Sequence, residues 1–163
     1  MGKTLILPVR WNLATAKPVL GINPAEKLLT NGIRGSLKYS DFEWCSWTNN
    51  DSVSFTIDLL KPEVLNTLTL GCITNNGMAI HKPASVKVEV SDDNSNFREA
   101  AMQSFTPEEI FREGNFIENL PLKLGGTQGR YVRVSAKGPG VCPASHVRSG
   151  QASRIFFDEV MLE

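Results

Sequence analysis

The sequence has few cysteines, no excess charge of either sign and no long apolar run, and each absence excludes a class of protein. Three cysteines in 163 residues are too few for a disulfide scaffold, and an odd number allows at most one bridge within the chain. The 17 Lys and Arg residues are balanced by 17 Asp and Glu residues, whereas a protein that grips nucleic-acid phosphates normally has a basic excess. We therefore expect no nucleic-acid partner.

Apolar runs are also short. None approaches the roughly 20 residues that a membrane-spanning helix requires, so we expect no membrane span and no membrane partner. The first residues, Met1 to Thr4, lack the long apolar core of a signal peptide. The length suits one domain of ordinary size, residues 1–163.

Helix signals are scarce as well. Two segments, Asn23 to Glu26 and Thr106 to Glu109, combine an N-cap side chain, a proline at the first helical position and a carboxylate three residues after the cap. Both segments are too short to connect parallel strands. Successive strands without long helices between them indicate antiparallel pairing.

Strand signals, in contrast, occur along most of the chain. The clearest is Val53 to Leu59, in which every second residue is apolar, as expected for a strand with one buried face. Further strands are expected at 67–72, 86–90, 120–124, 131–136 and 154–162, the last of them buried on both sides. The 13 glycines and nine prolines are spread through the chain and supply turns. These patterns predict an all-β domain built as an antiparallel sandwich or barrel.

Three long connections contain most of the polar residues that could recognise a ligand. They run from Thr30 to Ser52, from Ile73 to Pro83 and from Lys137 to Ser153. In all-β domains, function usually resides on loops that a rigid scaffold supports. The candidate site is therefore expected on these loops.

Five segments, in order, resemble the coagulation factor V/VIII type C family, also called discoidin domains. They are LTNGIRGS at 29–36, VSFTIDL at 53–59, PASVKVEVSDDNSNF at 83–97, RYVRVS at 130–135 and FDEV at 157–160. The likeness is greatest to the bacterial branch, which includes family 32 carbohydrate-binding modules and the C-terminal domains of β-hexosaminidases. It implies a galactose-binding-like jelly-roll β-sandwich of about eight antiparallel strands with one or two short helices.

The resemblance also implies a function. The chain would be a non-catalytic carbohydrate-binding module of a larger bacterial glycoside hydrolase, located outside the cell, in the periplasm or on the cell surface. Its expected partners are terminal galactose or N-acetylhexosamine-type glycans and the catalytic domain of the parent enzyme. Such sites combine an aromatic face with His, Arg, Asn or Asp side chains. The candidates are Asp41, Trp47, Asn75, His81, His146 and Arg148.

Other functions compete with sugar binding. The related hexosaminidase domains often have tryptophan where this chain has Ala79 and Ser145, which favours an accessory domain that packs on the catalytic domain and binds no ligand. Phospholipid binding would use Met78, Ile80 and Lys82. No phosphate-binding loop, nucleophile elbow or metalloprotease motif occurs, so the module itself is not expected to be an enzyme.

The family resemblance further implies a structural calcium ion. Calcium takes about six to eight oxygen ligands, and the matching positions are Leu28, Asn31, Ser36 and Glu159, with an amide at Asn31 where many relatives have a carboxylate. The alternative is that LTNG only ends a helix, with Asn31 or Gly32 in a left-handed conformation.

Zinc is a second metal to consider. Cys45, Cys72, Cys142, His81 and His146 lie in or beside the three long connections, and zinc prefers Cys and His ligands. Cys142 and His146 are the only pair with close spacing. The alternatives are free buried cysteines or one disulfide within the loops.

Overall fold

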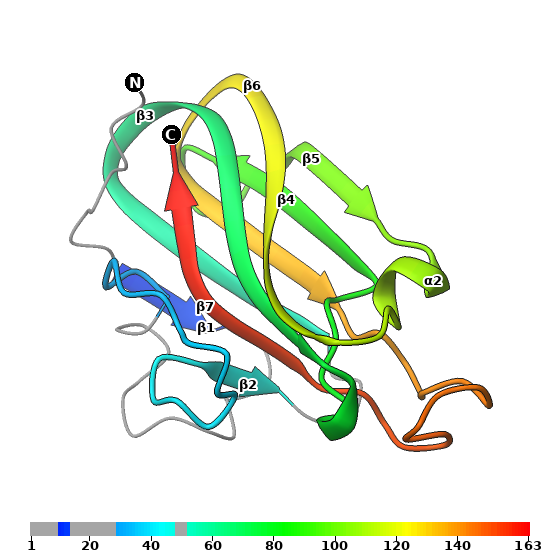
Figure 1. Cartoon of the computed structure of the whole chain (residues 1–163). Helices are drawn as coiled ribbons and strands as arrows, with labels where there is room; N and C mark the ends of the chain where they lie inside the picture. The colour runs from blue at the N-terminus through cyan, green and yellow to red at the C-terminus, as the bar shows by residue number, and fades with distance from the viewer. Residues whose placement is uncertain (1–9, 14–28, 48–51) are drawn as a thin grey trace.

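The computed structural model describes residues 10–13, 29–47 and 52–163. Within these ranges the chain forms seven strands and two short helical turns (Figure 1). They are β1 (Arg10–Leu13), β2 (Cys45–Trp47), β3 (Val53–Asn75), η1 (Asn76–Met78), β4 (Ser85–Ser91), β5 (Arg98–Ser104), α2 (Pro107–Ile110), β6 (Asn115–Lys137) and β7 (Ile155–Leu162). Every pairing between these strands is antiparallel, which confirms the predicted fold class.

Strands β3 and β6 are 23 residues long, and each curves over so that it serves two layers (Figure 1). Residues 53–58 of β3 pair with 131–136 of β6, and residues 67–75 pair with 115–123, with register shifts between the two stretches. In the first layer, β1 pairs with β3, β4 pairs with β6, and β5 pairs with β4. In the second layer, β7 pairs with β3, and β2 pairs with β7. This is the two-layer arrangement of a jelly roll.

The alternation seen in the sequence becomes the inner face of the sandwich. Phe55 and Ile57 of β3 are buried and lie opposite Val134 and Val132 of β6. Burial of each such side chain contributes about 1.5–3 kcal/mol relative to an exposed position. The closing strand β7 is buried on both sides, as its sequence predicts, because Ile155 and Phe157 pack in the main core and Phe156 packs in a second, smaller cluster.

Trp44 belongs to a second, smaller cluster of buried residues. Its indole Nε1 donates a hydrogen bond to the carbonyl oxygen of Ser36 at 2.9 Å. A Cβ atom on Gly35 would lie 2.2 Å from the Trp44 ring, so only glycine fits there. Gly32 has a φ of 76°, the left-handed conformation expected for this turn. The Gly-x-x-Gly-Ser turn is therefore set by packing against Trp44.

The second predicted helix start forms as its sequence indicates. Thr106 accepts a hydrogen bond from the Glu109 amide, and the Glu109 side chain accepts one from the Thr106 amide, which makes a reciprocal capping box at α2. The segment from Asn23 to Glu26 lies outside the described residues. No helix in the described part of the chain has the length and apolar character needed to cross a membrane.

All three cysteines are free thiols and buried, so the disulfide alternative is not realised. Burial raises the pKa of the Cys45 thiol to about 12, with a smaller contribution from Asp158. Cys45 and Cys72 pack in the main core, whereas Cys142 lies in the loop after β6. Only Cys142 is therefore placed near the loop end of the molecule.

The turn between β4 and β5 is organised by the Asp93 carboxylate. Its Oδ1 atom accepts hydrogen bonds from the backbone amides of Ser95 and Asn96, and Oδ2 accepts one from the Asn96 side chain. The Asn96 amide and side chain hold the pKa of Asp93 well below its usual range.

Asp93→Asn is expected to lose a stabilising effect that depends on pH. Because the pKa is lower in the folded than in the unfolded state, the charge stabilises the fold fully above the unfolded value of about 3.9, and this stabilisation is lost progressively as pH falls from there through the lower folded value. Urea unfolding of both proteins from pH 7 to pH 2 would show this as a difference that shrinks on acidification. A difference independent of pH would contradict the assignment.

Candidate functional site

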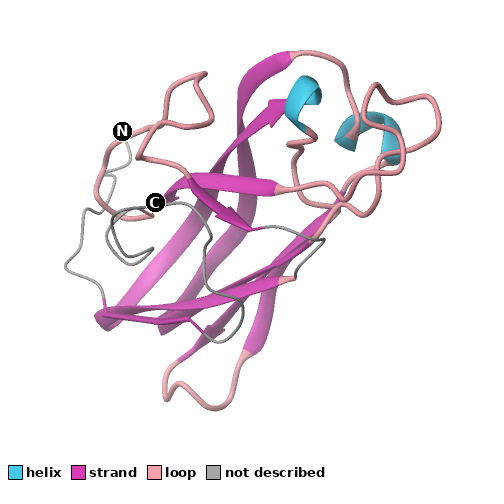
Figure 2. Ribbon diagram, turned by 90° about the horizontal axis from the view of Figure 1, so that it is seen from below, coloured by secondary structure: helices cyan, strands magenta, loops and turns pink. Residues whose placement is uncertain are grey.

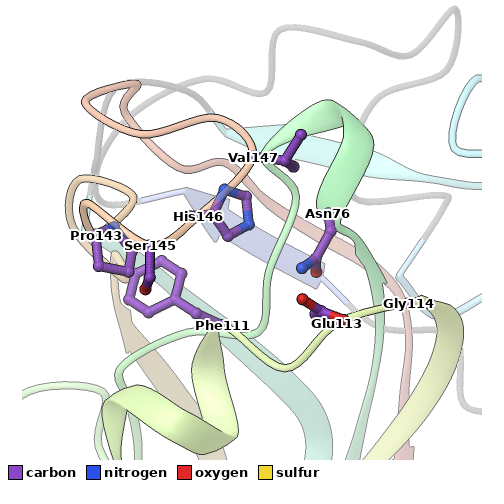
Figure 3. Close-up of a pocket in the computed structure, with 8 residues that line it drawn as sticks. All are labelled: Asn76, Phe111, Glu113, Gly114, Pro143, Ser145, His146 and Val147. Carbon is purple, nitrogen blue, oxygen red and sulfur yellow. The ribbon is translucent and has the colours of Figure 1, made fainter.

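A pocket of about 420 Å³ opens at one end of the sandwich, where Figure 2 shows both short helices. Three connecting segments form it: η1 after β3, the residues after α2, and the loop after β6. The lining residues drawn in Figure 3 are Asn76, Phe111, Glu113, Gly114, Pro143, Ser145, His146 and Val147. The volume lies in the range of about 300–1,000 Å³ that is usual for small-molecule sites.

Backbone hydrogen bonds hold two of the three long connections together. The amide of His81 donates to the carbonyl of Arg154 at 3.0 Å, and the amide of Arg154 donates to the carbonyl of Ala79 at 2.9 Å. Asn75 and Ile80 pair across the η1 turn. The loop after β6 is thus attached to the end of β3, although the two are far apart in the sequence.

A chain of hydrogen bonds links the side chains beneath this junction. The Nδ1 atom of His81 lies 2.5 Å from Ser153 Oγ, and Ser153 Oγ donates to the Ala79 carbonyl. The Nε2 atom of His81 lies 3.1 Å from Nε2 of His146. The Nδ1 atom of His146 accepts the backbone N–H of Arg148 at 2.9 Å.

These contacts assign the protons on both rings. Since Arg148 donates to Nδ1 of His146, the proton of that neutral ring is on Nε2 and points at His81. His81 accepts it at Nε2 and donates from Nδ1 to Ser153. Burial, with a smaller contribution from the nearby His146, lowers the pKa of His81 to about 4, so His81 is neutral at pH 7.

Phe111 is the aromatic residue of the pocket. Its ring packs edge-on against His81 and His146, with centroid distances of 5.0 and 6.0 Å. Glu113 is the one carboxylate or cationic side chain among the lining residues, and Figure 3 shows it facing the Asn76 amide. The Asn76 Oδ1 atom is buried without a hydrogen-bond partner in the described structure. The pocket therefore combines an aromatic surface with groups that accept hydrogen bonds.

Four predicted sugar-binding residues lie at this end, but they differ in access. His146 lines the pocket, whereas His81 is 0% exposed and cannot touch a ligand in this conformation. The Arg148 guanidinium donates from Nε to the carbonyl of Gly77 at 2.7 Å and so ties the loop to η1. Asn75 ends β3, and its backbone pairs with Ile80. The prediction of direct contact is thus wrong for His81, which supports His146 from below.

Trp47 and Asp41 are not part of the pocket. Trp47 is 1% exposed and packs on Phe157 with a centroid distance of 5.5 Å, so the prediction that it stacks on sugar is wrong. Asp41 accepts hydrogen bonds from the backbone amides of Ser36 and Glu43, which lower its pKa. It shapes its own loop.

Sequence reasoning missed the segment after α2. Phe111 and Glu113 follow the capping box directly, and neither was among the candidates, because the short connection 105–114 was not counted with the long loops. An aromatic residue placed between a helix cap and the helix-ending Gly114 was the available signal. Asn76 was overlooked beside the candidate Asn75.

The residues proposed to touch phospholipid are largely buried. Ile80 is inside the smaller core, and Lys82 is buried in an ion pair with Glu118 at 3.3 Å. An apolar spike with a basic neighbour must be exposed to enter a membrane surface. This geometry does not support the lipid alternative.

Two of the positions expected to bind calcium are adjacent. The Gly32 amide, next to Asn31, donates to Glu159 Oε2 at 3.0 Å, and the Asn31 side chain donates to Glu43 Oε2 at 2.9 Å. Burial raises the pKa of Glu159 to about 7, against the lowering effect of the Gly32 hydrogen bond. Two carboxylates thus contact this turn, whereas the Asn31 amide oxygen accepts the backbone N–H of Ile33 at 2.8 Å.

The other two calcium positions differ in their placement. Ser36 accepts at its carbonyl from Trp44 and at Oγ from the Lys38 amide, so its oxygens already have partners in the neighbouring loop. Leu28 lies outside the described residues. The Ser36 carbonyl oxygen has two lone pairs and can accept a second contact. The described residues therefore supply some, but not all, of the oxygen ligands that calcium needs.

A jelly-roll sandwich with a small pocket formed by the loops at one end is the architecture of a ligand-binding β module. The chain belongs to the F5/8 type C domain family, whose model matches residues 17–149. Domains of this family and family 32 carbohydrate-binding modules are generally non-catalytic. A comparison with curated protein sequences finds no match.

Solved structures of low sequence identity share the fold. The C-terminal domain of a chitobiase from Bacteroides fragilis has a TM-score of 0.57 at 16% identity, covering 99% of this chain and 97% of that one. The family 32 carbohydrate-binding module of EndoD from Streptococcus pneumoniae has a TM-score of 0.60 at 12% identity, covering 99% of each chain. A family 32 module from Clostridium perfringens, solved with GalNAc-β-1,3-galactose, has a TM-score of 0.56 at 16% identity, with 94% of each chain covered.

Proposed function

We propose that this chain is a carbohydrate-binding module whose loop-end pocket binds a terminal sugar. The observation that carries the proposal is the pocket itself, in which the Phe111 ring lies beside Pro143 and Ser145 on one side and the hydrogen-bonding side chains of Asn76 and Glu113 lie on the other (Figure 3). The C–H face of a pyranose packs on an aromatic ring, and its hydroxyl groups donate to carboxylate and amide oxygens. Galactose and N-acetylhexosamines are the first ligands to test, given the disaccharide bound by the similar Clostridium perfringens module.

His146 has a different role in this proposal from the one expected from sequence. Both of its ring nitrogens already have hydrogen-bond partners, His81 and the Arg148 amide. The His146 ring therefore forms part of the pocket wall and has no ring N–H free to donate a hydrogen bond to a ligand. Direct polar recognition falls to Asn76, Glu113 and the exposed hydroxyl of Ser145.

We further propose that the module belongs to a larger enzyme. Domains with a similar fold are part of a chitobiase and of EndoD, which supports attachment to a glycoside hydrolase such as a β-hexosaminidase. The module would hold that enzyme on its glycan substrate. Such an enzyme would act outside the cell, in the periplasm or at the cell surface.

Phe111→Ala is expected to weaken sugar binding by about five- to tenfold, since a stacking ring contributes about 1 kcal/mol or more. A glycan array followed by NMR titration with galactose, N-acetylgalactosamine and N-acetylglucosamine measures the effect. Met102→Ala is the matched control. Met102 lies on β5, in a second hollow that shares no lining residue with the loop-end pocket, so this variant should bind sugar normally. Absence of binding by the unaltered chain at millimolar sugar would overturn the proposal.

The accessory-domain alternative rests on a different surface. A hollow of about 500 Å³ lies over β4, β5 and the adjoining ends of β3 and β6, and Met102 within it is 57% exposed. An exposed apolar side chain in a hollow suits packing against another domain. If no sugar binds, this surface is the place to look for contact with a catalytic domain.

We also propose that calcium binds at the turn of Asn31. Glu159 would supply a carboxylate, with the Asn31 amide oxygen and Glu43 close by. A cation there would compensate a buried negative charge and fasten the 29–36 turn to β7.

Calcium is expected to raise the midpoint of thermal unfolding of the chain, and Glu159→Gln should abolish most of that increase. The measurement compares unfolding in calcium with unfolding in a chelator. Glu63→Gln, which alters a surface ion pair with Lys61, is the control and should respond to calcium normally. An equal response of Glu159→Gln and the unaltered chain would exclude Glu159 as a ligand.

A further inference from the structure

One group of side chains has a use that sugar binding does not require. His81, Cys142 and His146 place one potential metal-ligating atom each within 4.8 Å of one another. All three side chains are buried or nearly so, and they come from two segments far apart in the sequence, the end of the η1 connection and the loop after β6. Both histidines of the chain are in this group.

We propose that His81, Cys142 and His146 form a binding site for a zinc-type divalent metal ion. Two nitrogens and one thiolate are ligands that zinc prefers and that calcium and magnesium avoid. The site is therefore distinct in chemistry from the oxygen-rich turn of Asn31. It does not depend on whether the pocket binds sugar.

The distances suit a tetrahedral ion. Zinc bonds of about 2.0–2.1 Å to nitrogen and 2.3 Å to sulfur place neighbouring ligand atoms about 3.3–3.7 Å apart. The two Nε2 atoms are already 3.1 Å apart. The Cys142 sulfur lies within 4.8 Å of a ring nitrogen of each histidine, so reaching tetrahedral spacing requires an inward shift on the order of 1 Å.

His81 is already oriented as a ligand. Histidines that bind metal usually donate their second ring N–H to a fixed acceptor, which sets the tautomer. His81 does this through Nδ1 to Ser153, whose hydroxyl donates in turn to the Ala79 carbonyl. Its Nε2 lone pair is thus directed away from the backbone and toward His146.

His146 must change its proton for the ion to bind. The ion replaces the hydrogen now shared between the two Nε2 atoms, and neutral His146 then carries its proton on Nδ1. The Arg148 amide, which now donates to that atom, has to turn away. Cys142 releases its thiol proton to solvent, so each ion bound releases one proton.

The remaining coordination position is open to a water molecule or a ligand oxygen. His146 borders the pocket, and the edge of Phe111 covers both rings. Three protein ligands and one exchangeable position are the arrangement of reactive rather than purely structural zinc sites. Bound ligands in the pocket would then be close to the ion.

The test uses Co²⁺ as a spectroscopic substitute for zinc, added to the reduced, purified chain. We expect a thiolate-to-metal absorption band at one equivalent, abolished by Cys142→Ser and reversed by Zn²⁺. His81→Ala should weaken binding by more than tenfold, and Ser153→Ala by about tenfold, as for other groups that orient a metal-binding histidine. Cys45→Ala removes a thiol from the core and should leave the band unchanged.

Two further readouts separate a metal site from a structural role of these residues. Proton release measured in weak buffer should approach one per ion, and the Arg148 amide resonance should shift on metal addition. Thermal unfolding without metal checks that each variant is folded. A missing thiolate band in the folded chain, or a band that survives in Cys142→Ser, would overturn the proposal.

Discussion

Trp47→Ala is expected to lower the free energy of unfolding by about 3–5 kcal/mol, the usual cost of truncating a large buried aromatic side chain. Trp47 is part of the main core, and its ring packs on Phe157 in the paired strand β7. Alanine would leave a cavity between β2 and the opposite layer. Urea unfolding at neutral pH, followed by circular dichroism, measures the change.

The same substitution distinguishes the core role from the sugar-stacking role that the sequence suggested. Trp47→Phe, which retains a ring, should lose much less stability than Trp47→Ala. Phe42→Ala, at a residue that is 61% exposed, is the matched aromatic control and should change stability by less than about 0.5 kcal/mol. Unchanged stability combined with lost sugar affinity in Trp47→Ala would contradict the core assignment.

Asp158→Ala is expected to cost about 2–3 kcal/mol, because it removes a fully buried carboxylate that accepts hydrogen bonds from a backbone amide and from Arg34, whose own side chain is one-third exposed and keeps part of its hydration. Asp158 is 0% exposed, and its Oδ2 atom accepts from Nε of Arg34 at 2.7 Å and from the Gly35 amide at 2.8 Å. Its Oδ1 atom lies where a Cβ on Gly71 would sit. Loss of the carboxylate would leave a cation and an amide without their acceptor.

A surface ion pair provides the comparison for Asp158. Asp92 and Arg98 are both at least half exposed, and such pairs contribute at most about 1 kcal/mol. Urea unfolding of Asp92→Ala and Asp158→Ala under the same conditions should therefore show a clear difference. Similar small losses for both variants would mean that Asp158 does not fasten the 29–36 turn to β7.

The strands were predictable from sequence because alternation depends on the local chain. Residues 53–59 put every second side chain into the core, and the capping box at Thr106 forms α2 from four neighbouring residues. The bend of β3 was not predictable in this way. The alternating patterns predict two strands, at 53–59 and 67–72, whereas in the structure one strand continues through Pro62, with Leu60 at a φ of 68°.

The pocket was predictable only in part, because it depends on which distant segments meet. His81 and His146 were chosen as polar loop residues, but only the packed structure shows that one supports the other. Trp47 is misread because three residues of β2 are too few to show which face is buried. Phe111 joins the site through the position of α2 beside the loop after β6, which local patterns do not encode.

The position of β7 has a consequence for how the chain acquires its structure. Phe157 pairs with both Cys45 of β2 and Cys72 of β3, so the layer that contains these strands is complete only when β7 is in place. Pairings between residues so distant in sequence make folding slow, and unpaired strand edges promote aggregation of intermediates. We expect the docking of β7 to be a late step in folding. Once β7 is in place, the strand edges of β2 and β3 that pair with it are no longer open.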